Sequence, residues 1–174
     1  NLGHAHPAIH EAISKQSKTL LHTSNLYGIE PQEQLASQLC QLSSMDNAFF
    51  CNSGAEANEA AIKIARLYGR ENGVENPAIL VMKQSFHGRT MGTLSATGNQ
   101  KVQEGFSPLL EGFIHVAFND ISAIKNALKL HKNIVAIFLE PVQGEGGVHI
   151  PADNYLNEIR EVCDQNNLLM MLDE

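Results

Sequence analysis

The sequence predicts an α/β fold in which helices flank a mostly parallel sheet. Short apolar runs, typical of buried strands, alternate along the chain with segments of helical periodicity. Short polar joints separate the two kinds of segment, as in consecutive β-α units. The 174 residues, 43% of them hydrophobic and 18% charged, supply enough apolar surface for a core. This length favours one compact domain.

The N-terminal part is expected to be helical. Residues 7–21 and 31–43 are predicted helices, because Pro7 and Pro31 stand at the early helical position that tolerates a proline. We expect this helical segment, residues 1–45, to lead into the larger α/β part of the chain.

Five apolar runs predict the strands. Each is rich in β-branched, aromatic or long aliphatic residues and is bounded by polar ones. The runs are residues 48–51, 78–83, 113–118, 134–140 and 168–172.

Three further helices are predicted between these strands. One covers residues 55–70, one follows the N-cap residue Asp120 to about residue 130, and one extends from 151 to 167. Residues 85–100 contain three glycines and many hydroxyl groups, so we expect a loop there with one short helix.

Chemically reactive or small residues gather where three of the predicted strands end. Ser53-Gly54-Ala55 follows one strand, Glu140 and the glycine-rich QGEGG follow another, and Asp173 follows the last. Ligands of parallel α/β sheets bind at the carboxyl ends of the strands. We therefore expect these residues to share one site.

The turn Ser53-Gly54-Ala55 precedes a helix, so its backbone N–H groups and the Ser53 hydroxyl are suited to hold a phosphate. The sequence matches neither a Walker loop nor a dinucleotide fingerprint, which favours a single small phosphate over ATP or NAD. The alternative is a tight joint in which Ser53 only caps the helix.

Four other side chains are candidates for contact with a ligand. Asp173 ends an apolar strand and needs a partner, either a cationic ring nitrogen or a Lys or Arg. Phe86 could stack on a flat ligand or pack in the core. Arg89 could grip a carboxylate or lie on the surface, and Glu145, between glycines, could approach a ligand or remain solvated. A phosphate anchor, an aromatic face and an acid for a ring nitrogen together describe a pyridoxal phosphate pocket.

Composition and charge argue against several other classes. A net charge of −7 without a basic run excludes a nucleic-acid footprint. No stretch approaches the roughly 18 apolar residues of a membrane span, and the first residues do not resemble a signal peptide, so a cytoplasmic location is expected. The three cysteines predict neither a disulfide framework nor a metal site. We also expect no metal site at the four histidines nearest the start, because no acid or cysteine completes a ligand set.

Five motifs resemble, in order, those of the class III pyridoxal-phosphate aminotransferases: NLGHAHP, NSGAEANEAAIKIAR, SFHGRTMGTLSATG, EPVQGEGGV and the terminal LLMMLDE. Residues 20–39 are most similar to the acetylornithine aminotransferases of arginine biosynthesis. The resemblance implies a fold-type I transferase domain, with residues 46–174 as part of its cofactor-binding large domain. The chain begins without methionine and ends directly after a strand. We therefore expect a fragment that is incomplete on its C-terminal side and lacks the C-terminal small domain.

By the same resemblance, Ser53-Gly54-Ala55 would bind the phosphate of pyridoxal 5′-phosphate and Phe86 would stack on its ring. Asp173, followed by Glu174 in the cofactor site, would pair with the protonated ring nitrogen. Arg89 would grip the carboxylate of N-acetylornithine or of 2-oxoglutarate. Glu145 would act as a gate that pairs with an arginine further along the family's sequence.

The implied reaction moves the δ-amino group of N-acetylornithine to 2-oxoglutarate. In the family the lysine that carries the cofactor lies beyond the position of Glu174, so residues 1–174 by themselves are expected to be inactive. Relatives are homodimers, and a homodimer is expected of the full-length form.

Two alternatives remain open at this stage. One is another class III enzyme, acting on ornithine or 4-aminobutyrate, which differs in the residues that contact the substrate tail. The other is a non-catalytic α/β module that binds a phosphate at the same helix terminus.

Overall fold

The computed structural model describes residues 2–174, which form two compact units divided between Phe49 and Phe50. The first unit contains two helices, α1 (Pro7–Ser17) and α2 (Glu30–Ser43), and neither helix has a buried residue. The first predicted helix was expected to reach residue 21. It ends earlier because the N–H of Thr19 bonds to the carbonyl of Gln16, three residues back, and so tightens the last turn.

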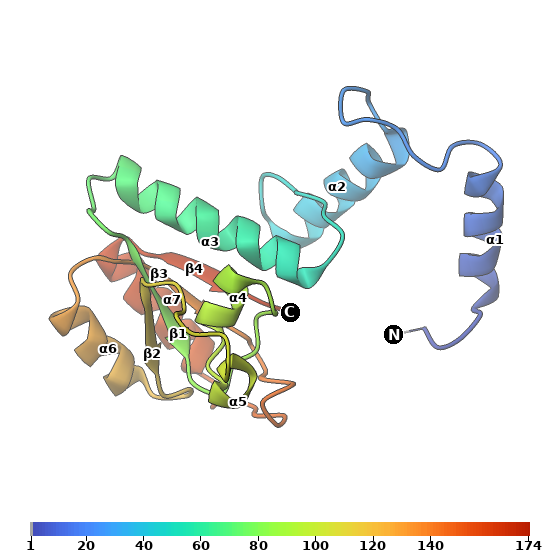
Figure 1. The fold of residues 1–174 in the computed structure, drawn as a ribbon. Coiled ribbons are helices and arrows are strands. Elements are labelled where there is room, and N and C mark those ends of the chain that lie inside the picture. Colours follow the sequence, from blue (N-terminus) through green and yellow to red (C-terminus); the bar gives the residue numbers. More distant parts are fainter. Residues whose placement is uncertain (1) are drawn as a thin grey trace. The chain divides into compact units, whose positions relative to one another are not determined.

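The second unit is built on a sheet of four parallel strands, as predicted (Figure 1). The strands lie in the order β2-β1-β3-β4, so β1 and β3 form the centre of the sheet. Their bounds are β1 Ala78–Met82, β2 Phe113–Val116, β3 Ile134–Leu139 and β4 Leu169–Leu172.

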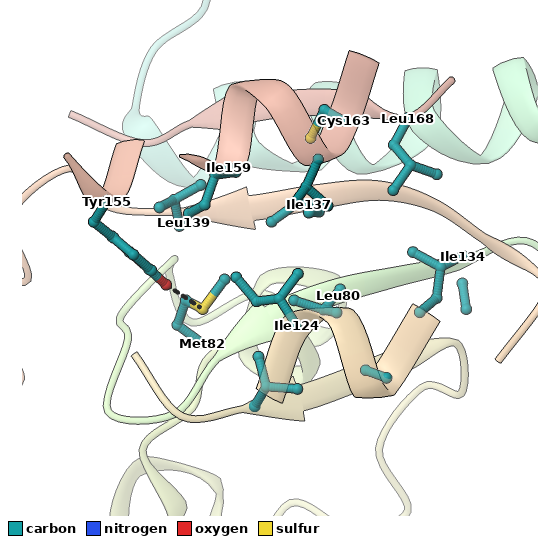
Figure 2. Packing of buried hydrophobic residues seen from close by; sticks show 14 residues of the cluster. Leu80, Met82, Ile124, Ile134, Ile137, Leu139, Tyr155, Ile159, Cys163 and Leu168 are labelled. Atoms are coloured by element: carbon teal, nitrogen blue, oxygen red, sulfur yellow. Dashed lines mark hydrogen bonds between the residues drawn. The ribbon is translucent and has the colours of Figure 1, made fainter. Parts of the chain in front are cut away.

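Three long helices cover the two faces of this sheet: α3 (Gly54–Glu71) on one face, and α6 (Ile121–Leu130) with α7 (Tyr155–Asn166) on the other. The alternation of side chains along a strand produces these two layers. Alternate residues of the central strands pack with Ile62 of α3, and the intervening ones pack with Ile124 of α6 and Ile159 of α7. Figure 2 shows the second of these layers.

Both central strands are buried along their whole length, which is why each reads as an unbroken apolar run. Asp120 caps α6, as predicted, by accepting a hydrogen bond from the N–H of Ala123 at 2.9 Å. The helix predicted from residue 151 begins at Tyr155. The N–H of Ala152 donates instead to the side chain of Asn119, which holds the preceding residues in a loop.

The strand predicted at residues 48–51 is wrong: this segment has no regular structure and the side chain of Phe49 is 73% exposed. A strand needs a neighbour to pair its backbone groups, and the four-stranded sheet of the described residues does not include this segment. An apolar run therefore does not suffice to make a strand.

The loop predicted at residues 85–100 contains the expected short helix, α4 (Met91–Ala96), and a single turn, α5 (Gln100–Gln103), starts at its end. Thr90 and Thr93 form a capping box at the start of α4. Glu59 of α3 accepts hydrogen bonds from Thr90 and from the N–H of Gly92, so the loop is tied to α3. Among the described helices, none is long and apolar enough to cross a bilayer.

Candidate functional site

The carboxyl ends of three neighbouring strands meet at one open hollow of the second unit. The segment after β1 contributes Phe86, and Glu140 directly follows β3. Asp173 directly follows β4, and its N–H donates to the carbonyl of Leu139. The lining residues are Phe86, Glu140, Pro141, Val142, Gly144, Asp173 and Glu174. The sheet order therefore brings together three residues proposed as cofactor contacts from the sequence: Phe86, Asp173 and Glu174.

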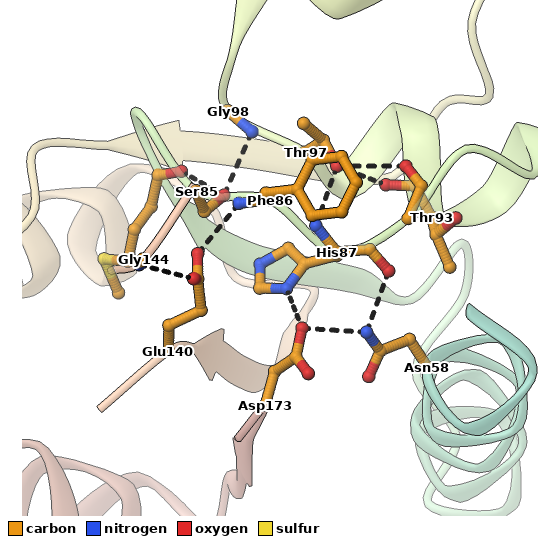
Figure 3. A network of polar contacts seen from close by, with 12 residues as sticks. Asn58, Ser85, Phe86, His87, Thr93, Thr97, Gly98, Glu140, Gly144 and Asp173 are labelled. Atoms are coloured by element: carbon orange, nitrogen blue, oxygen red, sulfur yellow. Dashed lines mark hydrogen bonds and ion pairs between the residues drawn. The ribbon is translucent and has the colours of Figure 1, made fainter. Parts of the chain in front are cut away.

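Asp173 is held by two donors (Figure 3). Its Oδ2 atom lies 2.8 Å from the Nδ2 atom of Asn58 and 2.8 Å from the Nδ1 atom of His87. The Asp173 side chain is 19% exposed, so the carboxylate reaches the hollow while its inner oxygen is fixed. No Lys or Arg forms an ion pair with it among residues 2–174.

His87 is enclosed by the protein. Its side chain has no exposed surface, and its ring stacks on that of Phe138 with 3.9 Å between centroids and 20° between planes. Its backbone N–H donates to the Thr97 hydroxyl at 2.9 Å, and its carbonyl accepts from Nδ2 of Asn58 at 2.8 Å. The backbone directly after Phe86 is thereby fixed.

Glu140 is buried and acts as a brace between two loops. Its Oε1 atom accepts from the N–H of Phe86 at 2.8 Å, and its Oε2 atom accepts from the N–H of Gly144 at 3.2 Å. Each carboxylate oxygen accepts from one backbone donor, so Glu140 supports the two segments that line the hollow.

The start of α3 has the features of an anion site. Ser53 caps the helix by accepting from the N–H of Glu56 at 3.2 Å, and the Glu56 carboxylate accepts from the N–H of Asn52 at 2.7 Å. The N–H groups of Gly54 and Ala55 donate to no acceptor within the described chain. Gly54 is exposed, and a methyl group built on it would meet nothing within 4 Å, so the space around Gly54 is open.

The N-terminal end of α3 lies near Asp173, because Asn58 of the same helix touches the Asp173 carboxylate. Asn58 is four residues after Gly54, which corresponds to about 6 Å along a helix axis. Ser53, Gly54 and Ala55 do not line the hollow themselves, but this spacing puts the start of α3 close to Asp173.

Arg89 and Glu145 are exposed and do not line this hollow. Glu145 directly follows Gly144 of the lining, and Arg89 lies three residues after Phe86. Neither forms an ion pair with any residue that the structure describes.

Asn58 and His87 were not identified from the sequence. Asn58 stands on the stripe of α3 that packs on the sheet, in line with Ile62, Ala65 and Gly69. A polar residue on such a stripe requires a buried partner, and that signal could have singled it out. His87 gave no comparable signal, since a histidine beside glycine in a polar loop is typical of exposed residues as well.

In a comparison with protein families, one family model matches residues 1–174. It is described as aminotransferase class-III. Among curated proteins, the acetylornithine aminotransferase of Nitrosomonas europaea is 57% identical over 173 residues. That alignment covers 99% of this chain and 44% of the relative, so the chain spans less than half the length of the relative.

Solved structures agree with this result. The ornithine aminotransferase of Toxoplasma gondii superposes with a TM-score of 0.93 at 31% identity, over 98% of this chain and 41% of the other. An amine transaminase from an uncultivated Pseudomonas species, solved with pyridoxal phosphate bound, gives a TM-score of 0.89 at 28% identity, over 100% and 45% of the two chains. The α/β fold predicted from the sequence is confirmed.

Proposed function

The chain belongs to the class III aminotransferases, a family of pyridoxal-phosphate-dependent transaminases, and from this membership we propose that residues 46–174 form the greater part of a pocket for pyridoxal 5′-phosphate. The observation that carries the proposal is the position of Asp173, whose carboxylate reaches a hollow walled by Phe86 while two donors hold its inner oxygen.

The residues present fit this cofactor at three points. The free amides of Gly54 and Ala55 suit its phosphate, since they lie at a helix N-terminus where the space around Gly54 is open. Phe86 offers an aromatic face to a flat ring. The hollow is acidic, with Asp173 and Glu174 and no cation in its described lining, which suits a protonated ring nitrogen.

When bound, pyridoxal phosphate supplies an electron sink for the charge that develops on the substrate carbon. Residues of this chain would orient the cofactor and maintain its charge. Asp173 would hold the proton on the ring nitrogen, and Phe86 would fix the plane of the ring. Arg89 would bind the substrate carboxylate, and Glu145 would move between the two half-reactions according to which substrate is present.

We further propose that the full-length enzyme transfers the δ-amino group of N-acetylornithine to 2-oxoglutarate in the cytoplasm, as a homodimer. The 57% identity with an acetylornithine aminotransferase supports the amino donor. Ornithine is the second candidate amino donor, because the structure that superposes with a TM-score of 0.93 is an ornithine aminotransferase. Its sequence identity with this chain is 31%.

Residues 1–174 by themselves are proposed to have no transaminase activity. The family requires a lysine that carries the cofactor, and no lysine of the described chain lines the hollow that contains Phe86 and Asp173. Because the expected inactivity concerns residues 1–174 alone, the proposed reaction is tested on the full-length protein.

The test of the function measures glutamate formed from 2-oxoglutarate by the purified full-length protein with N-acetylornithine, ornithine or 4-aminobutyrate as donor. We expect the highest kcat/KM with N-acetylornithine. Replacement of Asp173 by Asn should lower kcat by about 100-fold or more, because a preorganised charge at the ring nitrogen is lost.

The matched control is Asp164→Asn, which removes an exposed carboxylate of α7 that pairs with Arg160. It should leave kcat unchanged. Absence of transfer from all three donors, or equal rates for the Asp173 and Asp164 variants, would contradict the proposed function.

A further inference from the structure

Glu59 of α3 is the acceptor for the segment that directly follows Arg89. Its Oε1 atom accepts hydrogen bonds from the Thr90 hydroxyl and from the N–H groups of Gly92 at 3.1 Å and Thr93 at 3.3 Å. Both N–H groups belong to the first turn of α4, where backbone donors have no acceptor within the helix. A carboxylate from another helix supplies that acceptor, so the start of α4 is fixed to α3, beside which it lies (Figure 1).

The residue directly before Arg89 packs against the same helix. Gly88 has a φ of +132°, and a Cβ atom there would lie 3.0 Å from Cβ of Ala55 and 2.6 Å from the hydroxyl oxygen of Thr93. The backbone of Gly88 is therefore in close contact with the first turn of α3 and with α4, and a glycine is required at this position. Contacts with α3 thus restrain the chain both directly before and directly after Arg89.

The two contacts come from neighbouring turns of α3. Ala55 and Glu59 are four residues apart in this helix, so their side chains lie on one face, about one turn from each other. The N–H of Ala55 is one of the two amides proposed to hold the cofactor phosphate. The start of α3 therefore sets both the place of that phosphate and the place from which the Arg89 side chain extends.

The Arg89 side chain itself remains available to a ligand. It is exposed and forms no ion pair with any of residues 2–174, and the nearby carboxylate of Glu59 is bound to the start of α4 instead. A guanidinium is a planar fork that can bind both oxygens of a carboxylate, and its selectivity depends on where the fork stands. A fixed backbone under a free guanidinium suits the capture of a carboxylate at one set position.

We propose that Glu59 is a positioning residue for the substrate: by holding the start of α4 it places Arg89 so that the guanidinium meets the substrate carboxylate while the reacting end of the substrate reaches the cofactor. This inference rests on the proposed function, which assigns the substrate carboxylate to Arg89. It adds a residue of α3 that acts on the substrate through Arg89 and leaves the contacts of the cofactor unchanged.

The experiment measures the steady-state kinetics of the full-length protein with the substitution Glu59→Ala. The KM for N-acetylornithine and for 2-oxoglutarate should each rise about tenfold or more, because hydrogen bonds between a charged group and the start of α4 are lost. The kcat should change by less than about threefold, since the loss concerns binding. The dissociation constant of pyridoxal phosphate should stay at the wild-type value.

The direction of the change separates position from charge. Loss of a negative charge close to Arg89 would by itself strengthen the binding of an anionic substrate. A higher KM in Glu59→Ala is therefore the result of a misplaced Arg89.

A double-mutant cycle tests whether Glu59 acts through Arg89. The quantity compared is kcat/KM for N-acetylornithine in Glu59→Ala, in Arg89→Ala and in the double variant. Residues that act independently have losses that multiply, whereas residues that act through one another do not. The double variant should be no worse than Arg89→Ala alone.

Two controls accompany these variants. Glu59→Gln keeps an acceptor oxygen at the same reach and should retain a KM within about threefold of the wild type. Glu158→Ala removes a carboxylate from the first turn of α7, which accepts from Asn154 at 3.3 Å and does not line the hollow. It should leave KM and kcat unchanged.

A second substitution keeps the proposal testable if Glu59→Ala does not fold. Glu59→Asp preserves the charge but withdraws the carboxylate by one methylene from the start of α4, so the KM for both substrates should rise here as well. Unchanged KM in the folded variants would overturn the inference, and so would losses that multiply in the double variant or a fall in kcat and cofactor affinity at unchanged KM. Failure of the unsubstituted full-length protein to bind pyridoxal phosphate would overturn the proposed function itself.

Discussion

At the residue scale, two buried histidine nitrogens illustrate how surroundings decide a side chain's chemistry. The Nε2 atoms of His87 and His115 are both buried without a hydrogen-bond partner among the described residues. His87 has a carboxylate at its other nitrogen, whereas His115 of β2 has none. For His115, burial is the largest cause that lowers its pKa below the usual value. The electrostatic influence of the neighbouring His87 and Lys83 lowers the pKa further, whereas hydrogen bonding with the backbone of Thr97 and Ala96 raises it.

This difference predicts a pH dependence of stability. The pKa of His115 is lower in the folded than in the unfolded chain, so the unfolded state binds a proton first as the pH falls. The free energy of unfolding should therefore decrease below about pH 6.5, by at most about 1.4 kcal/mol per pH unit for this one group.

The measurement is urea unfolding of the full-length protein at pH 7.5 and 5.5, for the wild type and for His115→Gln. The substitution should make the decrease smaller, since glutamine does not titrate. An identical decrease in both proteins would show that His115 does not contribute.

The residues of the site differ in how far the sequence could predict them. Asp173 was a candidate because a carboxylate at the end of an apolar strand needs a partner. Phe86 was a candidate because an aromatic residue in a glycine-rich loop can stack on a flat ligand. The structure places both at one hollow. Asn58 and His87 were missed because their partners lie 115 and 86 residues away in sequence.

At the scale of elements, local signals located most helices and misjudged one strand. Ser53 and Asp120 are caps whose partners lie three residues on, so the sequence contains the whole interaction. The predicted strand at residues 48–51 depended on pairing with another segment, which local sequence does not specify.

Gly98 shows how one position couples two elements. Its N–H donates to the carbonyl of Ser85 at 3.1 Å, and its carbonyl accepts from the N–H of Gln84 at 3.0 Å. A Cβ atom there would lie 2.7 Å from Cα of Lys83 and 2.8 Å from the backbone nitrogen of Gln84. These neighbours are backbone atoms of the segment that leads to Phe86, so they cannot move aside cheaply.

Gly98→Ala is therefore expected to destabilise the full-length protein by about 1–3 kcal/mol, as overpacking does. Gly144→Ala is the matched control, because a Cβ atom at Gly144 would meet nothing within 4 Å. It should change the free energy of unfolding by no more than about 0.5 kcal/mol. Denaturant titration compares the two, and equal stability of both variants would contradict the steric argument.

At the scale of the whole molecule, much apolar surface of the 174-residue chain is uncovered. Neither α1 nor α2 has a buried residue, and exposed side chains of the first unit include Leu21, Leu26 and Leu42. In the second unit, β4 forms one edge of the sheet and Leu172 is 46% exposed. Exposed apolar patches and unpaired strand edges both promote association.

Residues 1–174 expressed alone are accordingly expected to self-associate or precipitate. Light scattering during size-exclusion chromatography, with a thermal melt on the same sample, provides the check. A monodisperse monomer with a sharp cooperative transition would be the opposite result.

Local sequence was enough to predict the α/β class, most helices and the caps Ser53 and Asp120, because each depends on residues within a few positions of one another. Which runs became strands, and which side chains hold Asp173, depended on tertiary packing. These features join segments far apart in the chain, and only the strand order β2-β1-β3-β4 and the packing of α3 on that sheet bring them within hydrogen-bonding distance.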